Sequence, residues 1–143
     1  GFVAVQSVQI FFVQKNNKEG KYMLTKARSQ IEERIYLILR EKFPGFVIVQ
    51  NKTIDVGPKK LYADIYIENP IRMVIEVSPV QHRKMNEFFY KDHEAFWNAQ
   101  RNDKLKKEWA SKNDFTFIEL TEVHFKDIEQ SVVEIVNEHL KGE

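Results

Sequence analysis

LYADIYIENPIRMVIEVSPVQH, residues 61–82, has the pattern of two short strands joined by a tight turn. Apolar and polar residues alternate before Glu68-Asn69-Pro70, and an apolar run, MVIEV, follows it. A proline cannot donate a hydrogen bond to a strand ladder, so Pro70 belongs in the turn or at an edge. The stretch therefore predicts a β-hairpin that bends about Pro70.

Two acids stand equally far from that bend, Asp64 on the first strand and Glu76 on the second. In such a hairpin their side chains lie on one face and opposite each other. Like charges in that position are destabilising, and an acid inside an apolar run is costly unless a positive group compensates it. A divalent cation is the simplest compensation. The alternative, acids scattered on an exposed hairpin, fits Glu76 less well because residues 73–77 are typical of a buried strand.

Composition limits the class of protein. The 143 residues suit one domain, and 43% hydrophobic with 30% charged residues is typical of a globular protein. The absence of cysteine excludes disulfides, thiolate metal sites and a cysteine nucleophile. No apolar run approaches the roughly 20 residues that span a bilayer, so no membrane association is expected. The net charge is +1, but basic residues outnumber acidic ones by 20 to 13 over residues 1–112 and acidic ones lead by 8 to 2 thereafter. A polyanion is therefore expected to meet the front and middle of the chain, residues 1–112, rather than its end.

The N-terminal segment, residues 1–22, is expected to be separate from a domain over 23–143. Residues 2–14 alternate as a strand with two apolar faces, which this molecule or a partner must cover. Such a strand could join two copies into a homodimer. The polar residues 15–21 are expected to form a loop, and Met23 could be a native start, which would make the preceding segment foreign. The segment lacks the basic leader of a signal peptide.

A helix is predicted from Ser29, because Ser29 and Glu32 have capping-box spacing and a helical apolar stripe follows. Pro44-Gly45 ends it. Glu32 has two interpretations, as the capping partner of Ser29 or as a member of a site, and the two are compatible.

A strand over residues 46–54 and a turn over 56–60 precede the hairpin. After Glu76, Ser78-Pro79 ends the strand and leaves Gln81 and His82 just beyond it. His82 is either a structural surface residue or, because it follows an acidic strand end, a catalytic one.

A second helix extends to about residue 112, with Trp97, Leu105 and Trp109 on one face that is expected to pack in the core. Asp103 lies at the border of that face and could point toward the strands. The basic residues of this helix form either a solvated face or a phosphate-contacting surface; they include Arg101, Lys104 and Lys106.

A further strand is predicted over residues 115–120, and an amphipathic helix with Ile128, Val132 and Val136 closes the chain. The order is helix, three strands, helix, strand, helix. It predicts an α/β fold with a mixed central sheet flanked by helices. No internal repeat, phosphate-binding glycine loop or zinc-ligand spacing is present.

This order, with acids on the second and third strands, resembles the PD-(D/E)XK nuclease superfamily, and within it the branch of very-short-patch repair and phage-type homing endonucleases. The resemblance covers about residues 29–120. The matching motifs are Asp64-Ile65-Tyr66-Ile67, Ile75-Glu76, Pro79-Val80-Gln81-His82, Asn102-Asp103-Lys104-Leu105-Lys106, Lys112-Asn113-Asp114 and Phe117-Ile118-Glu119-Leu120. The chain departs from the family at Val77, Ser78 and Pro79, where relatives often carry His or Asp and then Gly.

The resemblance implies a restriction-endonuclease-like αβββαβ core, here with an additional N-terminal strand and C-terminal helix. It implies that Asp64 and Glu76 hold Mg²⁺ or Mn²⁺, that Glu32 and Asp103 are supporting acids, and that Gln81 or His82 stands near the position of the family's lysine. The implied partner is DNA, with a duplex favoured over a single strand. The implied location is intracellular, in the cytoplasm or at the nucleoid, or in a host cell if a phage encodes the protein.

Three functions follow as hypotheses. The first is a metal-dependent endonuclease that hydrolyses DNA phosphodiester bonds, because a cation between two carboxylates neutralises a phosphodiester and activates water. His82 could then accept a proton. The second is a catalytically inactive module of the nuclease fold that binds nucleic acid or a protein partner, as the departures at residues 77–79 suggest. The third is an assembly role through residues 2–14.

Overall fold

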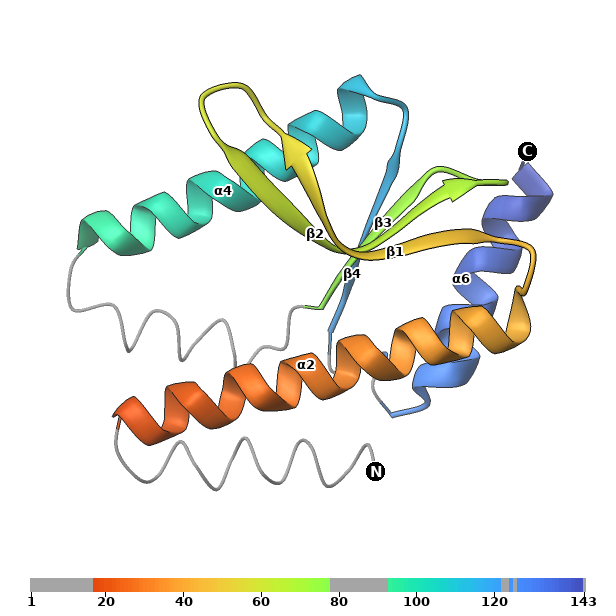
Figure 1. Cartoon of the computed structure of the whole chain (residues 1–143), viewed down its shortest axis with the longest axis horizontal. Helices are drawn as coiled ribbons and strands as arrows, with labels where there is room; N and C mark the ends of the chain where they lie inside the picture. The colour runs from red at the N-terminus through yellow and green to blue at the C-terminus, as the bar shows by residue number, and fades with distance from the viewer. Residues whose placement is uncertain (1–16, 78–92, 122–123, 125, 143) are drawn as a thin grey trace.

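The computed structural model of the chain describes residues 17–77, 93–121, 124 and 126–142 (Figure 1). Its elements follow the predicted order of helix, three strands, helix, strand and helix. They are α2 (Asn17–Lys42), β1 (Val47–Asp55), β2 (Lys60–Asn69), β3 (Met73–Val77), α4 (His93–Lys112), β4 (Thr116–Leu120) and α6 (Ile128–Gly142).

The four strands form one sheet in the order β1-β2-β3-β4. β1 pairs antiparallel with β2, β2 antiparallel with β3, and β3 parallel with β4. The predicted hairpin about Pro70 is thus confirmed as β2 and β3, and the predicted mixed sheet of an α/β fold is confirmed as well. The parallel pair needs a crossover connection, which contains α4.

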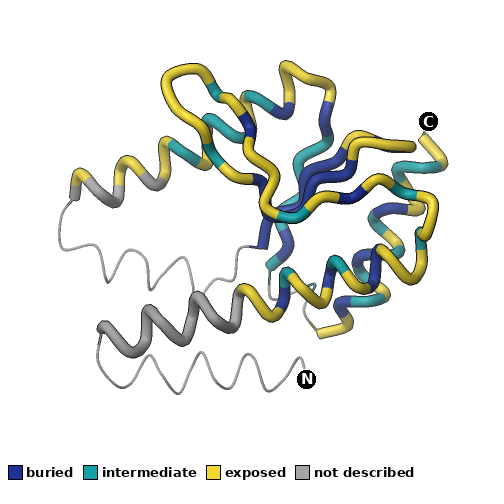
Figure 2. The backbone as a smooth tube through the Cα atoms, in the orientation of Figure 1, coloured by how far each residue is buried: buried dark blue, intermediate teal, exposed yellow. Residues whose placement is uncertain are grey.

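Helices cover both faces of the sheet (Figure 1). α2 and α6 pack together on one face, where Ile35, Leu39 and Val136 meet the strand residues Ile65 and Ile75. α4 packs on the other face, where a smaller cluster contains Ala63, Tyr66, Val74, Ala110 and Phe115. Every residue of β3 is buried, as the run MVIEV predicts (Figure 2). The sheet is therefore a layer between two cores, and β3 lies at its centre.

The first helix begins earlier than the sequence predicts. α2 starts at Asn17, so Ser29 lies inside it, is exposed and is not its N-cap. Of the loop predicted over residues 15–21, the described residues 17–21 are helical. The helix also crosses the expected boundary between residues 22 and 23. The physical reason is that Lys, Glu, Met, Leu and Ala in residues 18–28 are good helix formers, which outweigh the cost of about 1 kcal/mol for Gly20.

Trp97 is not a core residue, contrary to the prediction from its spacing with Leu105 and Trp109. It is 59% exposed, whereas Trp109 packs beside Tyr66 and Phe115. The N-terminal part of α4 extends past the sheet (Figure 1), so its turns have no strand to pack against in the described part of the chain. The predicted strand over residues 2–14, and the homodimer that it could form, lie outside the described residues.

No helix in the described ranges is long and apolar enough to cross a bilayer.

Candidate functional site

The site lies where β2 and β3 part. Their backbone pairing consists of Ile65 with Ile75, Tyr66 with Val74, and Ile67 with Met73. One more step in this register would pair Asp64 with Glu76, but the backbone pairing stops there. β2 continues with β1, and β3 continues with β4. We call this point, formed by Asp64, Glu76 and Val77, the fork.

Side chains replace the backbone pairing at the fork. The backbone N–H of Asp64 donates to Glu76 Oε2 at 2.7 Å, and the backbone N–H of Val77 donates to Asp64 Oδ2 at 3.1 Å. Each acid thus accepts a hydrogen bond from a buried backbone N–H on the other strand, at the place where the ladder bonds end. The prediction that the two carboxylates face each other across the hairpin is confirmed.

Burial of these two carboxylate charges costs free energy. Asp64 is 7% exposed and Glu76 is 6% exposed, and they are the two buried polar or charged residues in the described part of the chain. An Asn and a Gln could accept the same two hydrogen bonds without the cost of burying charge, which amounts to several kcal/mol per ion. The hydrogen bonds alone therefore do not account for two carboxylic acids at the fork.

Lys106 supplies a positive charge. Its Nζ lies 2.7 Å from Glu76 Oε1, and the side chains of the pair are 13% and 8% exposed. α4 brings Lys106 there because Ala110, one turn later on the same side of the helix, is buried against the sheet. The sequence predicts either a solvated face or phosphate contact for Lys106, and its contact with Glu76 was not predicted. Its spacing of three residues before Trp109 and four before Ala110 was the available signal.

The environment raises the pKa of the Glu76 carboxyl above its ordinary value. Burial is the largest cause, and the charge of Asp64 adds to it. The positive charge of Lys106 and the hydrogen bonds to Glu76 act in the opposite direction. A cation bound at the fork would oppose the two causes that raise the pKa.

The fork fits Mg²⁺ or Mn²⁺ by the chemistry of its donors. Both acids offer hard carboxylate oxygens, and Mg²⁺ is typically held by one or two carboxylates, with waters and substrate phosphates as the remaining ligands. No group of three or more acidic or histidine side chains gathers closely enough to hold an ion within the described residues. If the fork held an ion, Asp64 and Glu76 would be its two carboxylate ligands.

A buried oxygen on α4 has an unused bonding capacity. Asn102 Oδ1 is buried and has no hydrogen-bond partner among the described residues, and Asn102 precedes Lys106 by one helical turn. Buried polar atoms are nearly always paired, and an exception often marks the place of a bound water or ion. This oxygen is one more hard donor on the helix that covers the fork.

The other predicted site residues are placed as follows. Glu32 is half-buried on α2, the helix that covers the opposite face of the sheet from α4. Asp103, Arg101 and Lys104 are exposed on α4. Gln81 and His82 lie outside the described residues. The structure thus brings together Asp64, Glu76 and Lys106, and it leaves the roles of the others as predictions.

An acid that sequence analysis did not select lies beside the fork. Glu119 on β4 is in register with Glu76 on the parallel strand β3, so the two side chains leave the same face of the sheet. Lys107 Nζ is 3.8 Å from Glu119 Oε2. Consecutive lysines of α4 thus approach acids on adjacent strands, but Glu119 is more exposed than Glu76 and its pair is looser.

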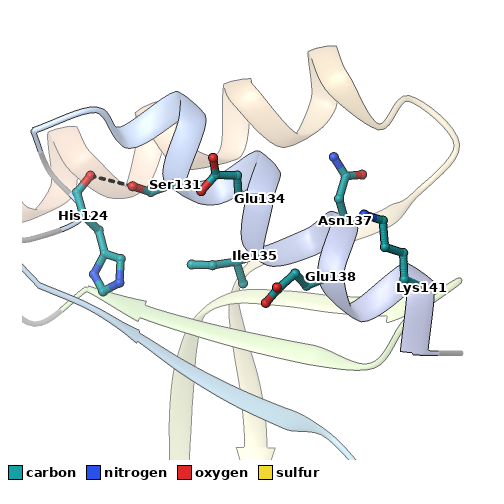
Figure 3. A pocket seen from close by; sticks show the side chains of 7 residues that line it. All are labelled: His124, Ser131, Glu134, Ile135, Asn137, Glu138 and Lys141. Atoms are coloured by element: carbon teal, nitrogen blue, oxygen red, sulfur yellow. Dashed lines mark hydrogen bonds between the residues drawn. The ribbon is translucent and has the colours of Figure 1, made fainter.

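A hollow of about 530 Å³ lies along α6 and includes His124, Ser131 and Lys141 (Figure 3). Its residues are not arranged for nucleophilic catalysis. Ser131 Oγ donates to the backbone oxygen of His124 rather than to the imidazole ring, and His124 Nδ1 accepts the N–H of Thr121. These hydrogen bonds hold the turn that leads into α6, and the fork remains the better candidate for chemistry.

Comparisons with protein-family models, with curated proteins and with solved structures find no match to this chain.

Proposed function

We propose that this protein is a metal-dependent endonuclease that hydrolyses DNA phosphodiester bonds at the fork. The observation that carries the proposal is the pair of buried carboxylates, Asp64 and Glu76. Each accepts a hydrogen bond from a backbone N–H of the other strand, and Lys106 donates to the second oxygen of Glu76. Paired acids with one lysine suit phosphodiester chemistry, in which negative charge must be balanced and a water oriented. The choice of DNA rests on the motif resemblance over residues 29–120.

The roles of the residues follow from their contacts. Asp64 and Glu76 would hold Mg²⁺ or Mn²⁺, which when bound supplies neutralisation of the phosphate and a water of lowered pKa. The backbone N–H groups of Asp64 and Val77 fix the orientation of one oxygen of each acid. Lys106 orients Glu76 through its second oxygen and would place a positive charge near a phosphate bound at the fork. In the reaction, water adds to phosphorus, and one phosphorus–oxygen ester bond breaks to leave a phosphate monoester and a hydroxyl.

The direct test is cleavage of supercoiled plasmid with Mg²⁺ or Mn²⁺ by the wild type, Asp64→Asn and Glu76→Gln. Both variants retain an oxygen that accepts the fork hydrogen bond, so the fold is expected to persist. Glu134→Gln is the matched control, because Glu134 is exposed on α6 and its neutral replacement can still accept from Gln130. We expect cleavage by the wild type and the control, and a loss of at least about 100-fold in the fork variants. Equal nicking by all four proteins would reject catalysis at the fork.

The alternative function is a nuclease-fold module that binds nucleic acid or a protein without cutting it. It is favoured by the fact that both oxygens of Glu76 already have partners, Asp64 N–H and Lys106. On this view the fork is a structural ion pair. Binding of a duplex by the wild type without cleavage, and unchanged by Mg²⁺, would support the alternative.

A further inference from the structure

The hairpin of β1 and β2 continues past the fork as a two-stranded arm, residues 52–63. Its strands pair from Lys52 with Ala63 to Asp55 with Lys60, and the described part of the chain adds no third strand beside them. The arm projects from the sheet on the opposite side from α2 and α6 (Figure 1). Its tip is the turn at Gly57, whose φ of 109° requires glycine.

The arm is solvent-exposed but held in place. Lys52, Lys59, Lys60 and Tyr62 are exposed, and Tyr62 leaves 59% of its surface uncovered (Figure 2). Ile54 alone on the first strand of the arm is buried, at 3% exposure, and Ala63 packs in the cluster under α4. A surface of lysines and an aromatic ring on an anchored hairpin is therefore presented to solvent without the ordering cost of a free loop.

The base of the arm coincides with the fork. Asn51 stands opposite Asp64 in the register of β1 and β2, and it has a left-handed φ of 51°. Ala63 packs on the α4 side, yet Ile65, two residues later, packs on the α2 side, so the strand alternation is interrupted at Asp64. Both strands thus depart from regular strand geometry where the arm meets the fork, β1 in the φ of Asn51 and β2 in its side-chain alternation.

The charge of the arm suits a polyanion. It carries three lysines and one acid, and the acid, Asp55, accepts the backbone N–H of Gly57 within the turn. Lys52 Nζ lies 5.7 Å from the centroid of the Tyr66 ring, on the α4 side near the fork. The positive groups therefore extend from the fork toward the tip.

The length of the arm matches a groove of DNA. Asp64 lies four residue steps along the strand from Lys60, a distance of about 13 Å. The major groove of B-DNA is about 12 Å wide, and a two-stranded ribbon can enter it. If one phosphate of the duplex lay at the fork, Lys59 and Lys60 near the tip of the arm would lie close to the phosphates on the other side of the groove.

We propose that the arm binds the phosphate backbone across the major groove of a DNA duplex whose scissile phosphate lies at the fork. The inference rests on the proposed function for the identity of the substrate. It assigns duplex binding to Lys52, Lys59 and Lys60, which sequence analysis did not select.

The test measures binding separately from cutting. The Asp64→Asn protein in EDTA keeps the fork hydrogen bond and does not cleave, so its affinity for a labelled duplex two helical turns long can be measured by fluorescence anisotropy at several salt concentrations. In this background Lys52, Lys59 and Lys60 are replaced by Gln. The matched control replaces Lys42, Lys126 and Lys141, which are three exposed lysines on or beside α2 and α6. Thermal unfolding establishes that both triple variants fold.

We expect the arm variant to lose roughly tenfold in affinity per phosphate contact at about 0.1 M salt, and its plot of log affinity against log salt to become less steep by about 3. The control should change much less. Equal affinity and slope in the arm variant and its parent would overturn the assignment, as would a loss for single strands alone or no duplex binding by the parent. If the protein does not cleave plasmid but its duplex binding still depends on the arm lysines, cleavage at the fork is rejected and duplex binding by the arm is supported.

Discussion

Replacing Lys106 by Met removes the charge beside Glu76 and keeps most of the apolar volume of the side chain. Coulomb's law gives about 6 kcal/mol for unit charges at the observed 2.7 Å and an effective dielectric constant of about 20. The measured loss of stability will be smaller, because Glu76 can become protonated and water can approach. Breaking a buried pair typically costs about 3–5 kcal/mol, and we expect Lys106→Met to lose that much at pH 8.

The loss should depend on pH. Burial and Asp64 already raise the pKa of Glu76, and removal of the opposing Lys106 raises it further. Between the pKa of about 4.3 in the unfolded chain and the raised pKa of the folded state, the folded protein binds more protons, so stability falls as pH rises. The difference between variant and wild type should therefore shrink as pH is lowered through the raised pKa toward about 4.

A divalent cation should offset the loss. Lys106 and a metal ion would both interact with Glu76, so replacing Lys106 by Met should strengthen metal binding at the fork. A ligand at 100 times its dissociation constant stabilises the folded state by about 2.7 kcal/mol. We expect Mg²⁺ to raise the free energy of unfolding of Lys106→Met more than that of the wild type.

Urea unfolding at pH 5, 6, 7 and 8, in EDTA or excess Mg²⁺, provides the measurement. Lys106→Arg is the control that retains the charge, and it should show a smaller loss with weaker dependence on pH. An equal loss at pH 5 and pH 8 would refute the assignment of the raised pKa to an uncompensated Glu76. No difference in the response to Mg²⁺ would refute the competition between lysine and metal.

Two further substitutions test the fold. Ser29→Ala should change the free energy of unfolding by less than about 0.5 kcal/mol in thermal or urea unfolding, because Ser29 is exposed inside α2; a loss of about 1 kcal/mol or more would instead indicate a helix cap. Ala110→Leu should destabilise by about 1–3 kcal/mol and reduce any plasmid cleavage, because Ala110 is 1% exposed where α4 meets the sheet and a larger side chain moves Lys106 from Glu76. Unchanged stability and cleavage would show that α4 is not positioned by this contact.

Local pattern was sufficient for much of the fold. The alternation before Asn69-Pro70 and the run MVIEV predicted β2 and β3, and equal distance from the turn predicted that Asp64 and Glu76 are opposed. These features depend on neighbours within about a dozen residues, where strand periodicity and turn chemistry determine the geometry. Helix boundaries were less accessible, because the polar residues and Gly20 at the start of α2 resemble a loop, although the good helix formers in residues 18–28 extend the helix through them.

Contacts between segments that are distant in the sequence could not be predicted from local pattern. The ion pair of Lys106 with Glu76 joins residues 30 positions apart, and it exists because Ala110 allows α4 to approach the sheet. Trp97 shares the helical face of Trp109 but is exposed, and the N-terminal part of α4 extends past the sheet of the described residues (Figure 1). Helical periodicity predicts which residues share a face of a helix, but it does not predict how far the sheet that packs against that face extends.

The amino-acid sequence by itself determined the strands, their turn and the opposed acids, because these are short-range consequences of side-chain periodicity and of proline's missing N–H. Only the tertiary structure decided that the strands part at Asp64, that the acids accept the N–H groups left there, and that a lysine of α4 meets one of them. Such contacts depend on how separate elements pack, and packing is a property of the whole folded chain.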